Sequence, residues 1–110
     1  MATQIQSKAG LAGDYIADVG WQYATVDLSA NSTTITTKKA ILGNAWVTVV
    51  LSAHACPIQD NTTEIISFAA SAAVGTTLTA QKDTQCLGGI VVDPNDSATG
   101  TIVVQYREIE

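Results

Sequence analysis

Short runs of alternating apolar and polar residues, separated by turns rich in Asp, Asn, Ser, Gly and Pro, make up most of this chain. The last run, 101–109, is the clearest, because Ile102, Val104 and Tyr106 fall on one face and the residues between them on the other. A period of two is that of a strand with one buried face. The segment 87–108 therefore predicts a β-hairpin in which two apolar runs flank a long loop.

Similar short-strand patterns occur along the chain from residue 21 onward. They cover 23–28, 33–37, 41–55 with a continuation through 56–60, 64–70, 76–80 and 87–92. About seven or eight short strands, with a turn roughly every ten residues and no periodic helix to compete, are typical of an all-β antiparallel β-sandwich or barrel. We predict a jelly-roll-like sandwich. An immunoglobulin-type core is disfavoured because Trp46 precedes both cysteines instead of lying between them.

The longest run, 41–55, is apolar on both faces, with Val47 on one and Trp46 on the other. A strand of this kind is central in a sheet or lies against another subunit. In the continuation through 56–60, Pro57 predicts a sheet edge or a bulge, because proline has no N–H for the ladder.

The first 20 residues differ from the rest, since Gly10, Gly13 and Gly20 separate short Ala-rich pieces without a sustained period. An extended arm and a fraying turn of helix both fit this pattern. With 110 residues in all, we expect residues 1–20 to be an N-terminal arm and residues 21–110 to form a single domain.

The composition excludes several classes of binding partner. The net charge is −5 and the five Lys and Arg residues form no basic stripe, so we expect no nucleic-acid partner. The apolar runs are too short to span a bilayer, and the N-terminus lacks the pattern of a secretion signal, so we expect no membrane partner and synthesis in a cytoplasm. Since only 14% of residues are charged, polar uncharged side chains or neighbouring subunits must cover much of the surface.

The two cysteines, Cys56 and Cys86, are too few for a disulfide framework. We expect free buried thiols, because a cytosol keeps thiols reduced. A disulfide and a metal-binding or reactive pair are the alternatives.

No combination of residues predicts a reaction centre, a metal site or a cofactor. His54 and Cys56 would share one face of a strand, but zinc needs about four ligands and only Cys86 remains to contribute. The segment 93–97 superficially resembles a calcium loop without its closing Gly and Glu, so we predict a turn held by Asp and Asn side chains, with Gly100 at positive φ after it. We expect a protein that is not an enzyme.

Three aromatic residues, Trp21, Tyr23 and Trp46, are candidates for binding. Large aromatics anchor cores and subunit interfaces, and they also stack against sugars. We favour an interface or core role, and keep a carbohydrate-binding platform of Trp21 and Tyr23 as the alternative.

The stretch 41–107, with LSAHACPIQDNTTEIISFAASAAVGTT in its middle and GGIVVDPNDSATGTIVVQYRE at its end, resembles the capsid decoration, or cement, proteins of tailed phages. Such proteins are typically β-rich homotrimers on the outside of the expanded head, and their N-terminal arm often reaches the shell. The resemblance implies a structural virion protein whose partners are its own copies and the major capsid protein. It makes the arm the capsid contact, with candidates Gln4, Ile5, Lys8, Leu11 and Tyr15. It makes the strand around Trp46 the subunit contact, with candidates Trp46, Thr48 and Val50.

Overall fold

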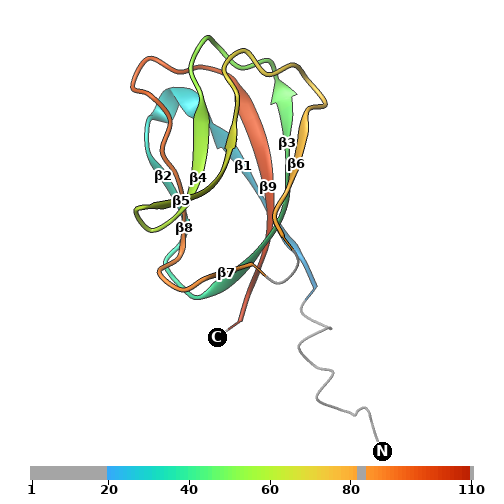
Figure 1. The fold of residues 1–110 in the computed structure, drawn as a ribbon, viewed down its shortest axis with the longest axis vertical. Helices are drawn as coiled ribbons and strands as arrows, with labels where there is room; N and C mark the ends of the chain where they lie inside the picture. Colours follow the sequence, from blue (N-terminus) through green and yellow to red (C-terminus); the bar gives the residue numbers. More distant parts are fainter. Residues whose placement is uncertain (1–19, 82–83, 110) are drawn as a thin grey trace, which may run out of the picture.

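The computed structural model describes residues 20–81 and 84–109, which form nine β-strands and one short 3-10 turn (Figure 1). The elements in chain order are β1 (Gln22–Asp27), η1 (Leu28–Ala30), β2 (Thr33–Thr36), β3 (Ala40–Val49), β4 (Cys56–Asp60), β5 (Thr63–Phe68), β6 (Thr77–Thr79), β7 (Gln85–Cys86), β8 (Ile90–Val92) and β9 (Thr101–Glu108). No helix in the described residues is long and apolar enough to cross a membrane.

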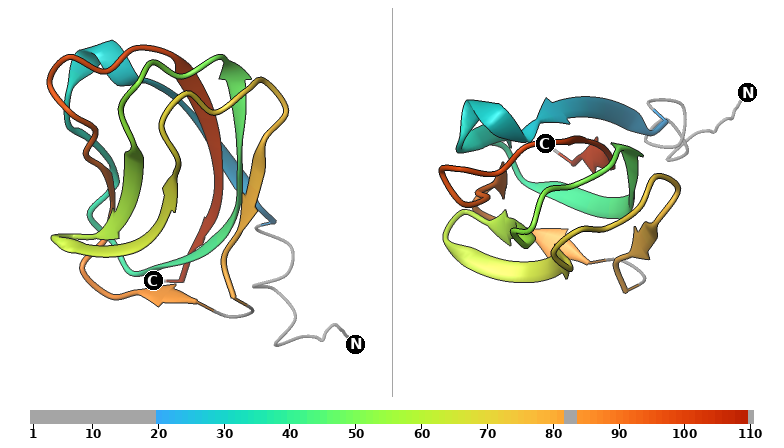
Figure 2. Two further views of the ribbon diagram at one scale, coloured as in Figure 1. Left: turned by 45° about the horizontal axis from the view of Figure 1, so that its top comes forward. Right: turned by 90° about the horizontal axis from the view of Figure 1, so that it is seen from above.

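The strands form two antiparallel sheets packed face to face, as the view from above in Figure 2 shows. Sheet A has the order β1-β9-β3-β6, with the two-residue β7 pairing to the start of β3, and sheet B has the order β2-β8-β4-β5. Leaving out β7, these are the two strand orders of a jelly roll. The all-β sandwich expected from the alternation is confirmed.

The core lies between the sheets and consists of the inward members of each alternating pair. Its largest fully buried side chains are Phe68, Leu28, Leu42, Ile58, Ile90 and Ile102. A single buried polar side chain, Thr36, occurs among the described residues, and its hydroxyl donates to Glu108 Oε2 at 2.6 Å. This bond joins β2 of sheet B to β9 of sheet A at the end where β9 leaves the domain.

The loops that follow β3, β5 and β8 meet at the opposite end of the sandwich (Figure 1). Ser52 connects them, because its backbone N–H donates to Thr99 O at 3.1 Å and its carbonyl accepts from Ser71 N at 2.7 Å. The Leu51 N–H also donates to Ala72 O at 3.0 Å, and Leu51 is buried. These backbone bonds tie the three loops to one another at this end of the sandwich.

Two expectations about strand continuity were wrong. The hairpin predicted for 87–108 does not form, because β8 pairs with β2 and β4 in sheet B whereas β9 pairs with β1 and β3 in sheet A. The strand predicted for 41–55 ends at Val49, and β4 is not its continuation but a strand of the other sheet. In both places the apolar pattern continues through a loop that crosses between the sheets, because the ends of the sandwich also bury apolar side chains such as Leu51 and Ala98.

Pro57 lies in β4, which is an inner strand of sheet B, so the predicted sheet edge was wrong. The pairing with β5 shifts between Ile58 and Gln59, so a bulge does follow directly. Pro57 takes part in the sheet through its carbonyl, which accepts from Asp93 N at 3.2 Å. The structure thus supports the bulge and not the edge.

Candidate binding surface

The outer side of sheet A carries an unusual concentration of aromatic side chains. The register pairs Thr25 with Val103 and Val103 with Trp46, so these three point to the same side, away from the core. Tyr23 pairs with Gln105 on that side, and its ring lies 6.1 Å from the Trp46 ring at an interplanar angle of 58°. We call the outward set Trp21, Tyr23, Trp46, Val103 and Arg107 the aromatic face.

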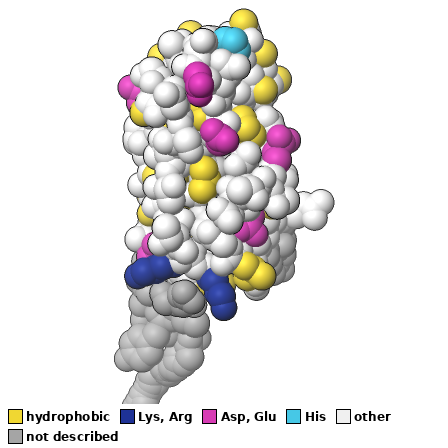
Figure 3. Space-filling view, turned by 90° about the vertical axis from the view of Figure 1, so that its left-hand side faces the viewer, with side chains coloured by type: hydrophobic (Ala, Val, Ile, Leu, Met, Phe, Trp, Pro, Cys, Tyr) yellow, Lys and Arg dark blue, Asp and Glu magenta, His cyan; other side chains and the backbone are white. Residues whose placement is uncertain are grey.

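Within the part of the chain that the structure describes, the aromatic face is only partly covered. Tyr23 is 60% exposed and Trp21 39%, whereas Trp46 and Val103 are half-buried. The matching row on sheet B is Thr34, Val91 and Gln59, with no aromatic member. In the view from the sheet B side, hydrophobic side chains are scattered over a mainly polar surface (Figure 3). The two outer sides therefore differ in chemistry, and the aromatic one is the candidate for binding.

A hollow lies beside the aromatic face, where β3 bulges at Gly43 and Asn44. The pairing of β3 with β9 shifts between Leu42 and Ala45, and the backbone N–H of Asn44 donates to Gln105 Oε1 at 3.0 Å. The side chain of Gln105 thus supplies an acceptor at the bulge.

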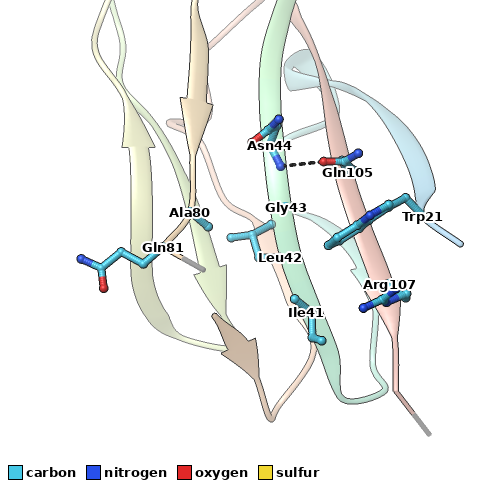
Figure 4. Close-up of a pocket in the computed structure, with 9 residues that line it drawn as sticks. All are labelled: Trp21, Ile41, Leu42, Gly43, Asn44, Ala80, Gln81, Gln105 and Arg107. Carbon is cyan, nitrogen blue, oxygen red and sulfur yellow. Dashed lines mark hydrogen bonds between the residues drawn. The ribbon is translucent and has the colours of Figure 1, made fainter. Parts of the chain in front are cut away.

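Gly43 makes room for this arrangement. A Cβ at this position would lie 2.6 Å from Gln105 Oε1 and 3.1 Å from Trp21 Cζ3. Without it, the hollow has a volume of about 310 Å³. Figure 4 shows the residues that line it, which are Trp21, Ile41, Leu42, Gly43, Asn44, Ala80, Gln81, Gln105 and Arg107.

Arg107 is the charged group of the hollow. Its Cζ lies 4.9 Å from the centroid of the Trp21 ring, which is the geometry of a cation–π contact. Its Nε is buried and has no hydrogen-bond partner within the described part of the chain. The indole therefore holds the guanidinium on the sheet while part of its donor capacity stays unused.

The two cysteines are free and buried, as expected. Burial raises the pKa of the Cys56 thiol to about 12. Burial, and secondarily the charge of Asp60, raises the pKa of the Cys86 thiol to about 11. Both are therefore neutral core side chains at ordinary pH and not nucleophiles.

His54 and Cys56 do not share a strand face, because His54 lies in a bend before β4 begins. Within residues 20–81 and 84–109, no three His, Cys, Asp or Glu side chains gather as a metal site would require. The segment 93–97 is the predicted turn, in which Asn95 Oδ1 accepts from Ser97 N at 2.8 Å. Gly100 has a φ of +117°, as expected.

The structure brings together two sets of residues that the sequence kept apart. Trp46 and Thr48, predicted for a subunit contact, lie on the same outer side of sheet A as Trp21 and Tyr23, predicted for a sugar platform. Val50 lies just past the end of β3 and is 55% exposed. The two hypotheses therefore compete for one surface. The predicted capsid contacts fall outside the described residues: Gln4, Ile5, Lys8, Leu11 and Tyr15.

Sequence analysis missed Gly43, Gln105 and Arg107 as site residues. The alternation in 101–109 did place Gln105 and Arg107 opposite the buried face, and so outward. Nothing in the sequence indicated that β9 would lie between the aromatic residues of β1 and β3.

Comparison with known proteins finds no match to a family model, a curated protein or a solved structure.

Proposed function

We propose that this chain is a structural, non-enzymatic virion protein of a tailed phage, which binds the outside of the capsid as a homotrimer and stabilises the mature shell. The observation that carries the proposal is the uncovered aromatic face on one sheet of a jelly-roll sandwich. The resemblance of residues 41–107 to capsid decoration proteins supplies the biological setting.

The aromatic face has the composition of a subunit contact. Core positions of protein interfaces are enriched in Tyr and Trp, and the face carries Tyr23 and Trp46 within one sheet. A stable contact of standard size needs about 800 Å² from each partner. In a closed ring of three, the aromatic face meets a different surface of the next copy.

The mechanism is mechanical. A trimer placed where capsomers meet gains binding free energy only when the shell has its mature geometry, so its attachment stabilises that geometry by mass action. Many copies on one shell make weak individual contacts add up. Packed DNA pushes outward, and the bound trimers raise the free energy needed to separate capsomers.

A carbohydrate-binding module is the second candidate, and the exposure of Tyr23 and Trp21 favours it. Sugars stack on aromatic rings that lie open to solvent. For this function the rings must remain open in the assembled protein, whereas for the subunit contact they must be covered.

Light scattering coupled to size-exclusion chromatography of the full chain tests the assembly. A trimer at micromolar concentration is expected, and a monomer there would overturn the trimeric proposal.

Sedimentation with phage heads tests the attachment. Expanded heads stripped of their outer proteins should bring the trimer down with them, whereas unexpanded precursor shells should not. Failure to sediment with expanded heads, or equal binding to both shell forms, would overturn the decoration role.

A further inference from the structure

We propose that the hollow over Gly43 binds a carboxylated sugar unit, with its carboxylate on Arg107 and its ring against Trp21. The inference goes beyond the structural role proposed above, because it assigns a small ligand to one edge of the outer surface. The hollow shares Trp21 and Arg107 with the aromatic face, but neither Tyr23 nor Trp46 lines it, so the site adjoins the aromatic pair that carries the proposed subunit contact.

The polar groups of the hollow fit a polyhydroxylated ligand. The amide side chains of Asn44 and Gln105 lie beside it, and each has both donor and acceptor atoms, whereas the Gln81 side chain points away from the hollow (Figure 4). Planar amides of this kind match vicinal hydroxyl groups, which donate and accept at once. The volume of about 310 Å³ is at the small end for ligand sites, which suits one sugar ring and not an extended chain.

Trp21 adds a surface for the apolar side of a pyranose. Its indole is 39% exposed and its edge reaches to Gly43, where a side chain would otherwise stand in the hollow. An aromatic ring beside the amides of Asn44 and Gln105 distinguishes this hollow from an ordinary gap between strands.

Arg107 favours a ligand that carries a carboxylate. The guanidinium is fixed by its contact with Trp21, and its Nε lacks a partner among the residues that the structure describes. Among the residues that the structure describes, no Asp or Glu lines the hollow, and Arg107 is the charged group there. A planar guanidinium binds a carboxylate through two parallel hydrogen bonds, and a neutral sugar has no carboxylate to accept them.

The test is a titration of the full chain with glucuronate, with glucose as the neutral match and inorganic phosphate as a second anion, followed by calorimetry or by saturation-transfer NMR. Glucuronate should bind with a dissociation constant on the order of 1 mM and at least about tenfold more tightly than glucose or phosphate. Equal affinity for glucose would overturn the role of Arg107. Tighter binding of phosphate would show an anion site and not a sugar site, and no binding at tens of millimolar would overturn the proposal entirely.

Three variants locate the binding. Arg107→Lys keeps the charge but loses the planar fork, so the preference for glucuronate over glucose should fall by roughly tenfold. Gly43→Ala should abolish binding, because its Cβ would occupy the hollow. The variant should still fold, because the nearest atom, Gln105 Oε1 at 2.6 Å, is the end of a flexible side chain that can move aside. The control is Leu87→Ser, which changes an exposed residue outside the hollow and should bind as the wild type does.

Melting curves confirm that each variant is folded, and unchanged binding by folded Gly43→Ala would place any sugar site elsewhere. Light scattering on the same samples separates this inference from the proposed function. A trimer that does not bind glucuronate refutes only the sugar site, and a monomer that does bind it refutes only the trimer.

Discussion

Replacing Tyr23 with Ser should weaken the proposed assembly much more than it weakens the fold. Tyr23 is 60% exposed in the single chain. A tyrosine offers about 200 Å² of surface, so roughly 120 Å² remains to be covered by a neighbour, worth about 3 kcal/mol per contact at about 25 cal/mol per Å². If the aromatic face forms the contact of the proposed trimer, each contact should weaken on the order of 100-fold. Within the chain, Tyr23→Ser loses its ring contact with Trp46, about 0.5–1.5 kcal/mol, and the exposed hydrogen bond that its hydroxyl accepts from Gln105 Nε2 at 3.5 Å.

The control is Leu87→Ser, because Leu87 is 59% exposed and belongs to the turn between β7 and β8 instead of the aromatic face. Sedimentation equilibrium over a wide concentration range measures assembly, and urea unfolding measures the stability of the fold. The trimer of Tyr23→Ser should dissociate at concentrations where Leu87→Ser and the wild type stay assembled. If Tyr23→Ser dissociates at the same concentration as the wild type, or if Leu87→Ser is equally weakened, the aromatic face is not the contact.

Three further predictions concern the fold and the arm. Gly75→Ala should lower the free energy of unfolding by about 1–3 kcal/mol, because φ is +91° but no atom lies within 4 Å of the new Cβ. Gly89→Ala, at φ +98°, should cost several kcal/mol more, because its Cβ would lie 2.3 Å from Thr36 O. Equal losses in urea unfolding would contradict this difference. The raised pKa values of Cys56 and Cys86, about 12 and 11 against an ordinary 9.0, mean that the folded chain keeps protons that the unfolded chain has released. Stability should therefore be fully present below about pH 8.5 and fall as the pH rises through 9 to 11, and a flat urea midpoint over that range would refute the burial of the thiols. Deleting residues 1–20 should leave a folded trimer that no longer sediments with expanded heads, and an unfolded product would show that this segment belongs to the core.

Alternation predicted the strands well because burial in a sandwich obeys the same period of two. In β9 it predicted the inward Ile102 and Val104, both fully buried. The positive φ of Gly100 was predicted separately, from a glycine that follows a turn. A strand's own residues carry this information, since a shift by one position would turn every buried side chain to solvent.

Partners of a strand are not encoded in the same way. Val92 and Ile102 lie in consecutive apolar runs, and a hairpin and a crossover between sheets bury both equally well. The positions that remain between the other strands decide in favour of the crossover. β9 fits between β1 and β3, while β8 fits between β2 and β4. The end of β3 was missed for a related reason, because Leu51 is buried in a loop and continues the apolar pattern past Val49.

The candidate binding surface depends on the pairing of β9 with β1 and β3, whereas the fold class follows from the alternation alone. Tyr23 and Trp46 come together only because β9 lies between their strands and presents small Val103 between them, and Gln105 reaches the bulge of β3 from the same strand. A hairpin of 87–108 would have left β1 and β3 with other neighbours and the aromatic residues apart. The crossover that sequence analysis missed is thus the feature that assembles the aromatic face and the hollow over Gly43, because it places β9, with Val103, Gln105 and Arg107, between β1 and β3.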